Sequence, residues 1–313
     1  MKVRFWGVRG SLPTPVSRKV IQDKITAVVQ RITAEDIETP EKRELFLSRL
    51  PDYLFGTVGG NTPCIEIQVS NDTLIILDAG SGIRELGVQI KKKMPKVRNL
   101  HIFFSHFHYD HIMGLPFFPP AYDPKVTIHF YSPIPNFEEI LRGQMHPPYF
   151  PVEMKVMYAD LYFHVLSEKQ IDIQNTVVEY LQRSHPGESF AYKINGPSKN
   201  IIYSTDTELS EEDFKKNEKN ISFFQNTDII ILDSQYTLGE AIEKFNWGHS
   251  SYSMAVDFAV EWGMEKLLLY HHEPLYDDQK LYTILKSARW YLEHIGGSGL
   301  DIDLAIEGKD LDI

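Results

Sequence analysis

The chain has 313 residues, of which 42% are hydrophobic and 24% are charged, a balance typical of a folded globular protein. Its net charge of -11 disfavours extended nucleic-acid binding, because phosphate contacts usually come from a surface rich in lysine and arginine, but it leaves a small anionic substrate possible. No apolar run approaches the roughly 18 residues of a membrane span, and the first residues lack a signal-peptide layout, so we expect a cytoplasmic protein without a membrane partner.

Short β-type segments, each bounded by Gly, Pro, Asn or Asp, recur along the chain. We expect strands at 2–8, 64–69, 73–78, 100–105, 125–131, 176–182, 200–205, 227–233 and 266–271. Helices are expected at 83–93, 209–219, 250–262 and 277–294. Several strands follow one another without a helix between them, which favours an α/β (α+β) layered fold of two sheets with outer helices over a doubly wound sheet. We expect 1–313 to form a single domain.

Residues 17–55 interrupt this order with a helical pattern. Four apolar residues from Ile21 to Ile32 would share one helix face, and Thr39 followed by Pro40 marks the start of another helix. The segment carries seven basic and seven acidic residues, so its net charge is zero. We therefore predict a helical insertion that covers the site or forms a homodimer contact, in preference to a nucleic-acid arm.

The stretch FFSHFHYDHIMG places His106, His108, Asp110 and His111 within six positions, directly after a predicted strand. Imidazoles and carboxylates are ligands that zinc and similar divalent ions prefer, and a loop at a strand end can direct all four side chains to one point. Without a metal, such a group would carry several desolvation penalties with no compensating bond. The cluster therefore predicts a metal site.

This cluster resembles the signature of the metallo-β-lactamase fold hydrolases, in particular the branch that contains ribonuclease Z and related phosphodiesterases. The resemblance covers nearly the whole chain outside 17–55. It extends to LDAGSG with Asp78, RSHPG with His185, YSTDTE with Asp206 and LYHHEP with His271. It implies an αββα sandwich in which Asp78 holds the ligand loop through hydrogen bonds.

The resemblance also implies two divalent metal ions, for which we expect zinc, with manganese or iron as alternatives. Seven side chains would bind them: His106, His108 and His185 for one ion, Asp110, His111 and His271 for the other, and Asp206 for both. His272 is an alternative to His271, because strand alternation sends these neighbours to opposite faces. We favour His271, the first histidine after the apolar segment KLLLY.

We expect three catalytic residues. Asp110 is one of them, and two further segments carry the other two. NWGHSSYS resembles a ribonuclease Z motif in which a histidine at a helix start donates a proton, and His249 precedes His271 by 22 positions, as in that branch. ILDSQYT resembles the partner segment, whose acid would be Asp233. A carboxylate behind an imidazole fixes its tautomer and raises its basicity, as a general acid requires. The simpler interpretations, a helix cap for His249 and a turn residue for Asp233, stay open.

The predicted reaction is hydrolysis of a small phosphodiester, such as a cyclic nucleotide. Two ions about 3.5–4 Å apart can share one water as a bridging hydroxide and aim it at phosphorus, while His249 protonates the departing oxygen. Arg9 in FWGVRGSLP and Asn61 in GTVGGNTP are candidate substrate contacts, although simple strand-connecting turns are the favoured interpretation of both glycine loops. The alternatives are an RNA-processing endonuclease of the ribonuclease Z type and a thioester or lactam hydrolase, with a redox di-iron or non-enzymatic role less favoured.

Overall fold

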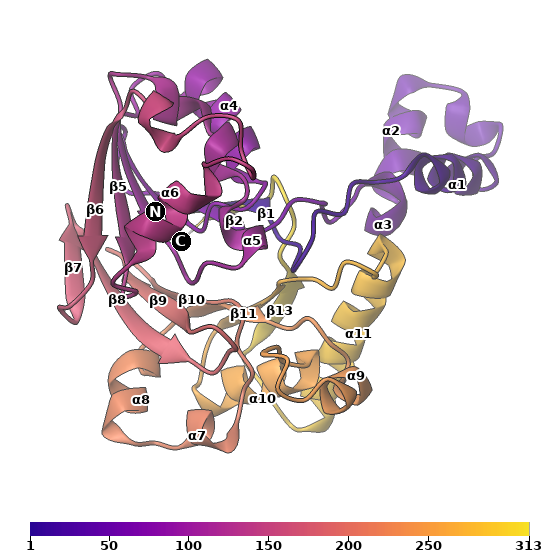
Figure 1. The fold of residues 1–313 in the computed structure, drawn as a ribbon. Helices are drawn as coiled ribbons and strands as arrows, with labels where there is room; N and C mark the ends of the chain where they lie inside the picture. The colour runs from indigo at the N-terminus through magenta and orange to yellow at the C-terminus, as the bar shows by residue number, and fades with distance from the viewer. Residues whose placement is uncertain (313) are drawn as a thin grey trace.

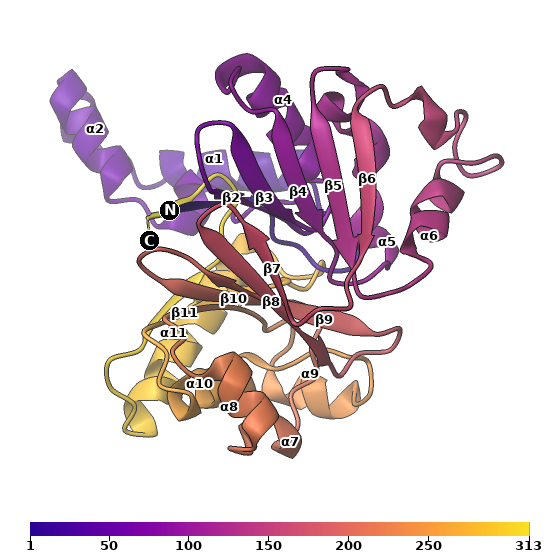
Figure 2. The same cartoon turned by 90° about the vertical axis from the view of Figure 1, so that its left-hand side faces the viewer.

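Two seven-stranded sheets pack face to face in the computed structural model, which describes residues 1–312 (Figures 1 and 2). The first sheet has the order β14-β1-β2-β3-β4-β5-β6 and the second has the order β13-β12-β11-β10-β9-β8-β7. The strands of the first sheet are β1 (Lys2–Gly7), β2 (Cys64–Gln68), β3 (Thr73–Leu77), β4 (Asn99–Phe103), β5 (Thr127–Ser132), β6 (Asp160–Val165) and β14 (Asp310–Asp312). Those of the second are β7 (Gln170–Ile173), β8 (Thr176–Arg183), β9 (Ser189–Asn195), β10 (Asn200–Ser204), β11 (Ile229–Asp233), β12 (Lys266–Tyr270) and β13 (Asp301–Leu304).

Helices cover the outer faces of both sheets (Figure 2). On the side of the first sheet lie α4 (Ile83–Lys93), α5 (Tyr109–Ile112) and α6 (Phe137–Gln144). On the side of the second lie α7 (Glu211–Phe214), α8 (Glu218–Phe224), α9 (Leu238–Glu243), α10 (Tyr252–Glu261) and α11 (Asp278–His294). The remaining helices are α1 (Arg18–Val29), α2 (Pro40–Ser48) and α3 (Asp52–Phe55), with 3₁₀ turns at Glu35–Ile37, Leu115–Phe117, Pro119–Tyr122 and Met154–Val156.

Strand alternation divides the interior into two apolar clusters. In β3, Ile75 and Leu77 belong to the cluster that includes the space between the sheets, whereas Leu74 and Ile76 pack in the cluster under α4 and α6. All five residues of β3 are buried, because this central strand is covered on both faces. The two layers hold the strand ends, and the loops that follow them, in fixed positions.

All nine predicted strands are present, with ends that differ by at most two residues, and the predicted pair of layered sheets with outer helices is confirmed. The sequence did not reveal five strands: β6, β7, β9, β13 and β14. Four of them, β6, β7, β13 and β14, lie at sheet edges, where partly exposed residues weaken the apolar pattern. The helix predicted at 209–219 is wrong in its extent, since two short helices, α7 and α8, replace it and Asn217 caps the second.

Residues 17–55 form an arm that projects from the two layers (Figure 1). Thr39 caps α2 by accepting a hydrogen bond from the Lys42 amide at 3.2 Å, with Pro40 in the first turn, as predicted. No residue of α1, α2 or α3 is buried, and Ile25 on the predicted apolar face is 58% exposed. In the single chain this face is open to solvent, so its role as a cover or a homodimer contact stays a prediction.

Within residues 1–312, we find no helix with the length and apolar character needed to cross a bilayer.

Candidate metal centre

The predicted ligands follow the carboxyl ends of strands that point to one edge of the molecule. β3 runs parallel to β4, and β10, β11 and β12 run parallel to one another, so the loops after them converge. Three residues within two positions of the ends of such strands adopt left-handed backbone conformations: Asp78 (φ 60°), Asp206 (φ 44°) and His271 (φ 59°). This conformation is uncommon for residues other than glycine, and such outliers are typical of functional sites.

Asp206 lies between two groups of histidines. Its Oδ1 is 3.1 Å from Nε2 of His111 and 3.1 Å from Nε2 of His271. Its Oδ2 is 3.6 Å from Nε2 of His106 and 3.7 Å from Nε2 of His185. Each carboxylate oxygen therefore faces one of the two predicted ligand sets, which is the arrangement that a bridging ligand requires.

The remaining contacts complete both sets. His108 Nδ1 lies 3.2 Å from His185 Nε2, and Asp110 Oδ2 lies 3.2 Å from His111 Nε2 and 3.3 Å from His271 Nε2. Possible ligand atoms lie within 4.8 Å of one another in each of two groups: His106, His108, His185 and Asp206, and Asp110, His111 and His271. The structure thus brings together all seven predicted ligands.

The donor atoms themselves show that these residues fit divalent ions. The buried Nε2 atoms of His106 and His111 lie 3.1–3.6 Å from carboxylate oxygens but form no hydrogen bond of acceptable geometry with the described residues. Buried polar atoms are rarely left unpaired, because an unmade hydrogen bond there costs about 1–3 kcal/mol. Burial opposes protonation of His111, but the carboxylates of Asp110, Asp206 and Asp78 raise its pKa well above the ordinary value. Bound cations would satisfy both nitrogens and offset this negative charge.

Asp78 holds the ligand loop, as the resemblance implies. Its Oδ1 accepts a hydrogen bond from the Ser105 amide at 2.7 Å, and its Oδ2 accepts from Ser105 Oγ and Tyr203 OH, each at 2.7 Å. The same Oδ2 lies 2.8 Å from His111 Nδ1, which must be the donor because a carboxylate only accepts. His111 Nε2 is thereby left available to an ion.

The structure directs His271, and not its neighbour, to the cluster. His272 Nε2 lies 2.9 Å from the Ala305 carbonyl oxygen, and burial together with the charge of Arg9 lowers the pKa of His272 to about 3. Gly10 leaves room for His271, since a Cβ at this glycine would lie 2.6 Å from the imidazole ring. The strand alternation expected from the sequence separates the two side chains.

His249 and Asp233 form a hydrogen-bonded pair beside the ligands. His249 Nδ1 donates to Asp233 Oδ2 at 2.7 Å, and its ring stacks on that of His271 with centroids 5.0 Å apart. Burial lowers the pKa of His249, but the Asp233 carboxylate outweighs this effect and raises it to about 9. The pair has the geometry of an oriented proton donor. His249 Nδ1 is occupied by Asp233, which leaves Nε2 for proton transfer.

Arg9 and Asn61, predicted as substrate contacts, are engaged within the protein. The Arg9 guanidinium is almost fully buried and donates to the carbonyl oxygens of Gly59, Glu273 and Tyr276 at 2.8–3.1 Å. Asn61 donates to Glu307 at 3.1 Å through Nδ2 and accepts from Ser81 Oγ at 3.0 Å. These contacts tie loops together, and neither side chain joins the ligand cluster.

Sequence reasoning missed several residues that support the site. The Ser11 amide donates to Asp110 Oδ2 at 2.8 Å, and Gln235 Oε1 lies 3.2 Å from His271 Nδ1. Gln235 follows Asp233 in the same motif, so a search of residues near the predicted catalytic acid would have found it. Ser11 contributes a backbone group, for which a sequence carries no signal.

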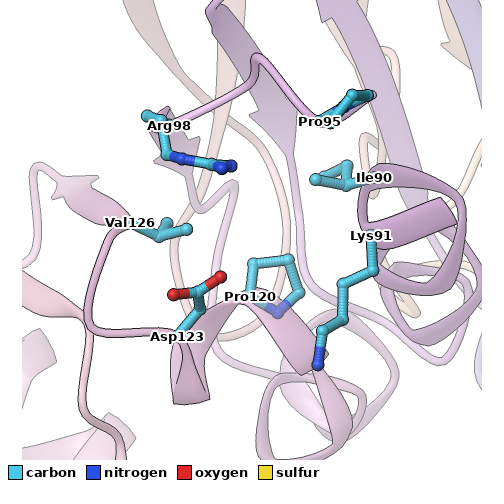
Figure 3. A pocket seen from close by; sticks show the side chains of 7 residues that line it. All are labelled: Ile90, Lys91, Pro95, Arg98, Pro120, Asp123 and Val126. Atoms are coloured by element: carbon cyan, nitrogen blue, oxygen red, sulfur yellow. The ribbon is translucent and has the colours of Figure 1, made fainter. Parts of the chain in front are cut away.

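A cavity elsewhere on the first sheet is separate from this centre (Figure 3). Arg98 and Val126, which line it, precede β4 and β5 and so lie at the amino ends of these parallel strands. The ligands lie at the opposite, carboxyl ends. Lys91, Asp123 and the other residues that line this cavity include no predicted ligand.

Comparisons with known proteins place these residues in context. The family described as "Beta-lactamase superfamily domain" matches residues 73–272, a range that contains all seven predicted ligands. Ribonuclease Z of Picrophilus torridus is 23% identical over 275 residues, which cover 71% of this chain and 84% of that protein. Among solved structures, the metallo-beta-lactamase fold protein YhfI from Bacillus subtilis has a TM-score of 0.64 at 18% identity, over 99% of this chain and 98% of that one. A diphosphatase from the PhnP family has a TM-score of 0.63 at 17% identity, over 100% and 97% of the two chains. These structural similarities identify the two-layered architecture as the metallo-β-lactamase fold, as the sequence predicted.

Proposed function

The chain belongs to the beta-lactamase superfamily, as a metal-dependent hydrolase with clustered histidine and aspartate ligands, and from this premise we propose that its substrate is a small phosphodiester such as a cyclic nucleotide. The observation that carries the proposal is the pair formed by His249 and Asp233, joined at 2.7 Å beside the ligand cluster. A phosphodiester releases an alkoxide, which is a poor leaving group and needs a proton. Thioesters and lactams need a nucleophile but depend less on a separate acid.

The site residues have separate roles in the proposed reaction. Two divalent ions, zinc by our proposal, would supply an activated water and offset the charge of the phosphate. Asp206 and the six other predicted ligands would hold these ions, and Asp78 fixes His111 among them. Asp233 accepts from His249 Nδ1, so the opposite nitrogen, Nε2, is the one that protonates the departing oxygen.

Two further observations support the proposal, one for the reaction and one for the size of the substrate. The names ribonuclease and diphosphatase, carried by proteins similar to this chain, both denote hydrolysis at phosphorus. The net charge of -11 and the neutral arm at 17–55 disfavour binding of an RNA body, since such binding depends on basic surfaces.

A substrate panel tests the proposal. Purified protein, analysed for zinc, manganese and iron, would be assayed on cyclic nucleotides, bis-p-nitrophenyl phosphate, a precursor RNA, a thioester and a lactam. We expect the highest kcat/KM on a small diester and none after chelation. Preferential cleavage of precursor RNA would instead support an RNA-processing endonuclease. Much faster turnover of the thioester or lactam would replace the phosphodiesterase proposal with the acyl hydrolase alternative.

A further inference from the structure

Glu208 lies two residues after Asp206, outside both ligand sets and outside the pair that transfers the proton. Its half-buried carboxylate accepts two backbone hydrogen bonds, from the Asn246 amide to Oε1 and from the Gly248 amide to Oε2, each at 2.9 Å. Both donors belong to the turn 246–248, directly before His249. One carboxylate therefore fixes the turn that carries the proposed proton donor.

The same turn supports a metal ligand. His185 Nδ1 donates to the Gly248 carbonyl oxygen at 2.9 Å, which leaves Nε2 for the ion. A Cβ at Gly248 would lie 2.1 Å from His185 Nδ1, so the turn and the imidazole are in direct contact. Asn246 and Gly248 have φ angles of 66° and 88°, in the left-handed region that asparagine and glycine adopt more readily than other residues.

Further hydrogen bonds join the same segments. Ser250 Oγ donates to the Thr207 carbonyl oxygen at 2.6 Å and accepts from the Leu209 amide at 3.0 Å. The Glu208 amide donates to the carbonyl oxygen of Ser184, next to His185, at 2.9 Å. The segments around His185, Asp206 and His249 are thus connected, with Glu208 at the junction.

We propose that Glu208 is a positioning residue: through the turn 246–248 it orients both His185 as a metal ligand and His249 as a proton donor. The half that concerns His249 rests on the proposed function. The half that concerns His185 rests on the ligand geometry alone, so each half has its own test.

The first test needs no substrate. In metal-free protein, Glu208→Ala should speed amide hydrogen exchange at Asn246 and Gly248, because both amides lose their acceptor. In a chelator competition, it should weaken binding of one of the two ions by about 10- to 100-fold, the usual effect of losing a group that orients a ligand. Glu208→Gln keeps one acceptor oxygen and should show a smaller effect. Glu243→Ala, which removes an exposed carboxylate from α9, serves as the matched control and should match wild type.

The second test uses two diesters at saturating metal. Glu208→Ala should slow turnover of a cyclic nucleotide by about 10-fold or more, part of the 10²- to 10⁴-fold that a general acid contributes, and should slow bis-p-nitrophenyl phosphate much less. In a His249→Ala background the same substitution should cost little further turnover but still weaken metal binding.

The outcomes separate the two halves. Unchanged amide exchange and metal affinity in folded Glu208→Ala, or in Glu208→Gln if the alanine variant does not fold, would overturn the link to His185. Equal losses on both diesters would overturn the link to His249. If wild-type protein hydrolyses no diester, the proposed function fails, while exchange and metal affinity still decide the role of Glu208 at His185.

Discussion

The Oε1 atom of Gln235 lies 3.2 Å from Nδ1 of His271, and the orientation of this amide is fixed because its Nε2 donates to Glu273 at 3.0 Å. His111, in the same predicted ligand set, instead donates its Nδ1 to the Asp78 carboxylate at 2.8 Å. A charged acceptor raises the basicity of an imidazole more than a neutral amide does. The two histidines of this predicted ligand set are therefore supported unequally.

We predict that Gln235→Leu weakens the ion held by Asp110, His111 and His271 and leaves the other ion in place. The variant loses the acceptor that fixes His271, so affinity for this ion should fall by about 10- to 100-fold. Gln235→Glu keeps an acceptor oxygen and should retain more affinity. Metal titration monitored by calorimetry would show one tight and one weakened site. The control is Gln279→Leu at an exposed position, which should bind both ions normally, and an unaltered titration of Gln235→Leu would count against the role of Gln235.

Asp206→Ala should weaken both ions together, because its two oxygens face different ligand sets at 3.1–3.7 Å. Metal analysis of wild-type protein should give close to two transition-metal ions per chain, and the variant should retain much less than one after dialysis. Asp172→Ala, an exposed position on β7, is the matched control. A variant that still holds one ion at wild-type affinity would rule out the bridging role of Asp206.

Four ligands could be predicted from local spacing alone, because His106, His108, Asp110 and His111 lie within six positions. His185, Asp206 and His271 are isolated in the sequence, and only the resemblance of their motifs to the family implied them. The two sheets were predictable from local pattern, since central strands such as β3 are continuous apolar segments.

The supporting residues could not be predicted because their roles depend on which distant loops meet. Glu208 is one acidic residue among 43 acidic residues, and its significance arises where the segment after β10 meets the turn 246–248. Arg9 shows the same dependence on distant loops. Its place in a glycine-containing loop predicted a phosphate contact, and the fold directs its donors to three carbonyl oxygens of other loops, so the substrate contact stays a prediction.

His249→Ala should reveal a proton donor through its dependence on the leaving group. We expect the variant to keep both ions and to lose about 10²- to 10⁴-fold in turnover of a cyclic nucleotide, whose ribose oxygen departs poorly. It should lose much less on bis-p-nitrophenyl phosphate, because p-nitrophenolate departs without a proton.

Asp233→Asn should show a milder form of the same pattern, since it disturbs the tautomer of His249 and leaves this acid in place. An exposed histidine provides the control, His146→Ala. Equal losses on both substrates, or a loss of metal, would falsify the assignment.

The arm at 17–55 should mediate a homodimer or limit access to the metal centre. Ile21 and Ile25 on α1 are 48% and 58% exposed, and an apolar helix face is stable in water chiefly when it is covered. Lys24 fixes the arm to the body through Gly56 and the buried Asp278. Ile21→Glu with Ile25→Glu should raise the dimer dissociation constant by about 100-fold or more, since each buried side chain contributes about 1.5–3 kcal/mol.

Light scattering across a concentration series would measure this change. Gln22→Glu adds a charge at an exposed polar position of the same helix and should leave the mass unchanged. Replacing 17–55 by a short glycine-serine linker is feasible, because the connecting segments lie side by side, with the Thr14 amide 2.7 Å from the Gly60 carbonyl oxygen. This deletion should yield a monomer or raise activity on larger diesters relative to small ones. If the deleted protein kept both its mass in solution and its preference for substrate size, the arm would have neither role, and its exposed isoleucines would require a different partner.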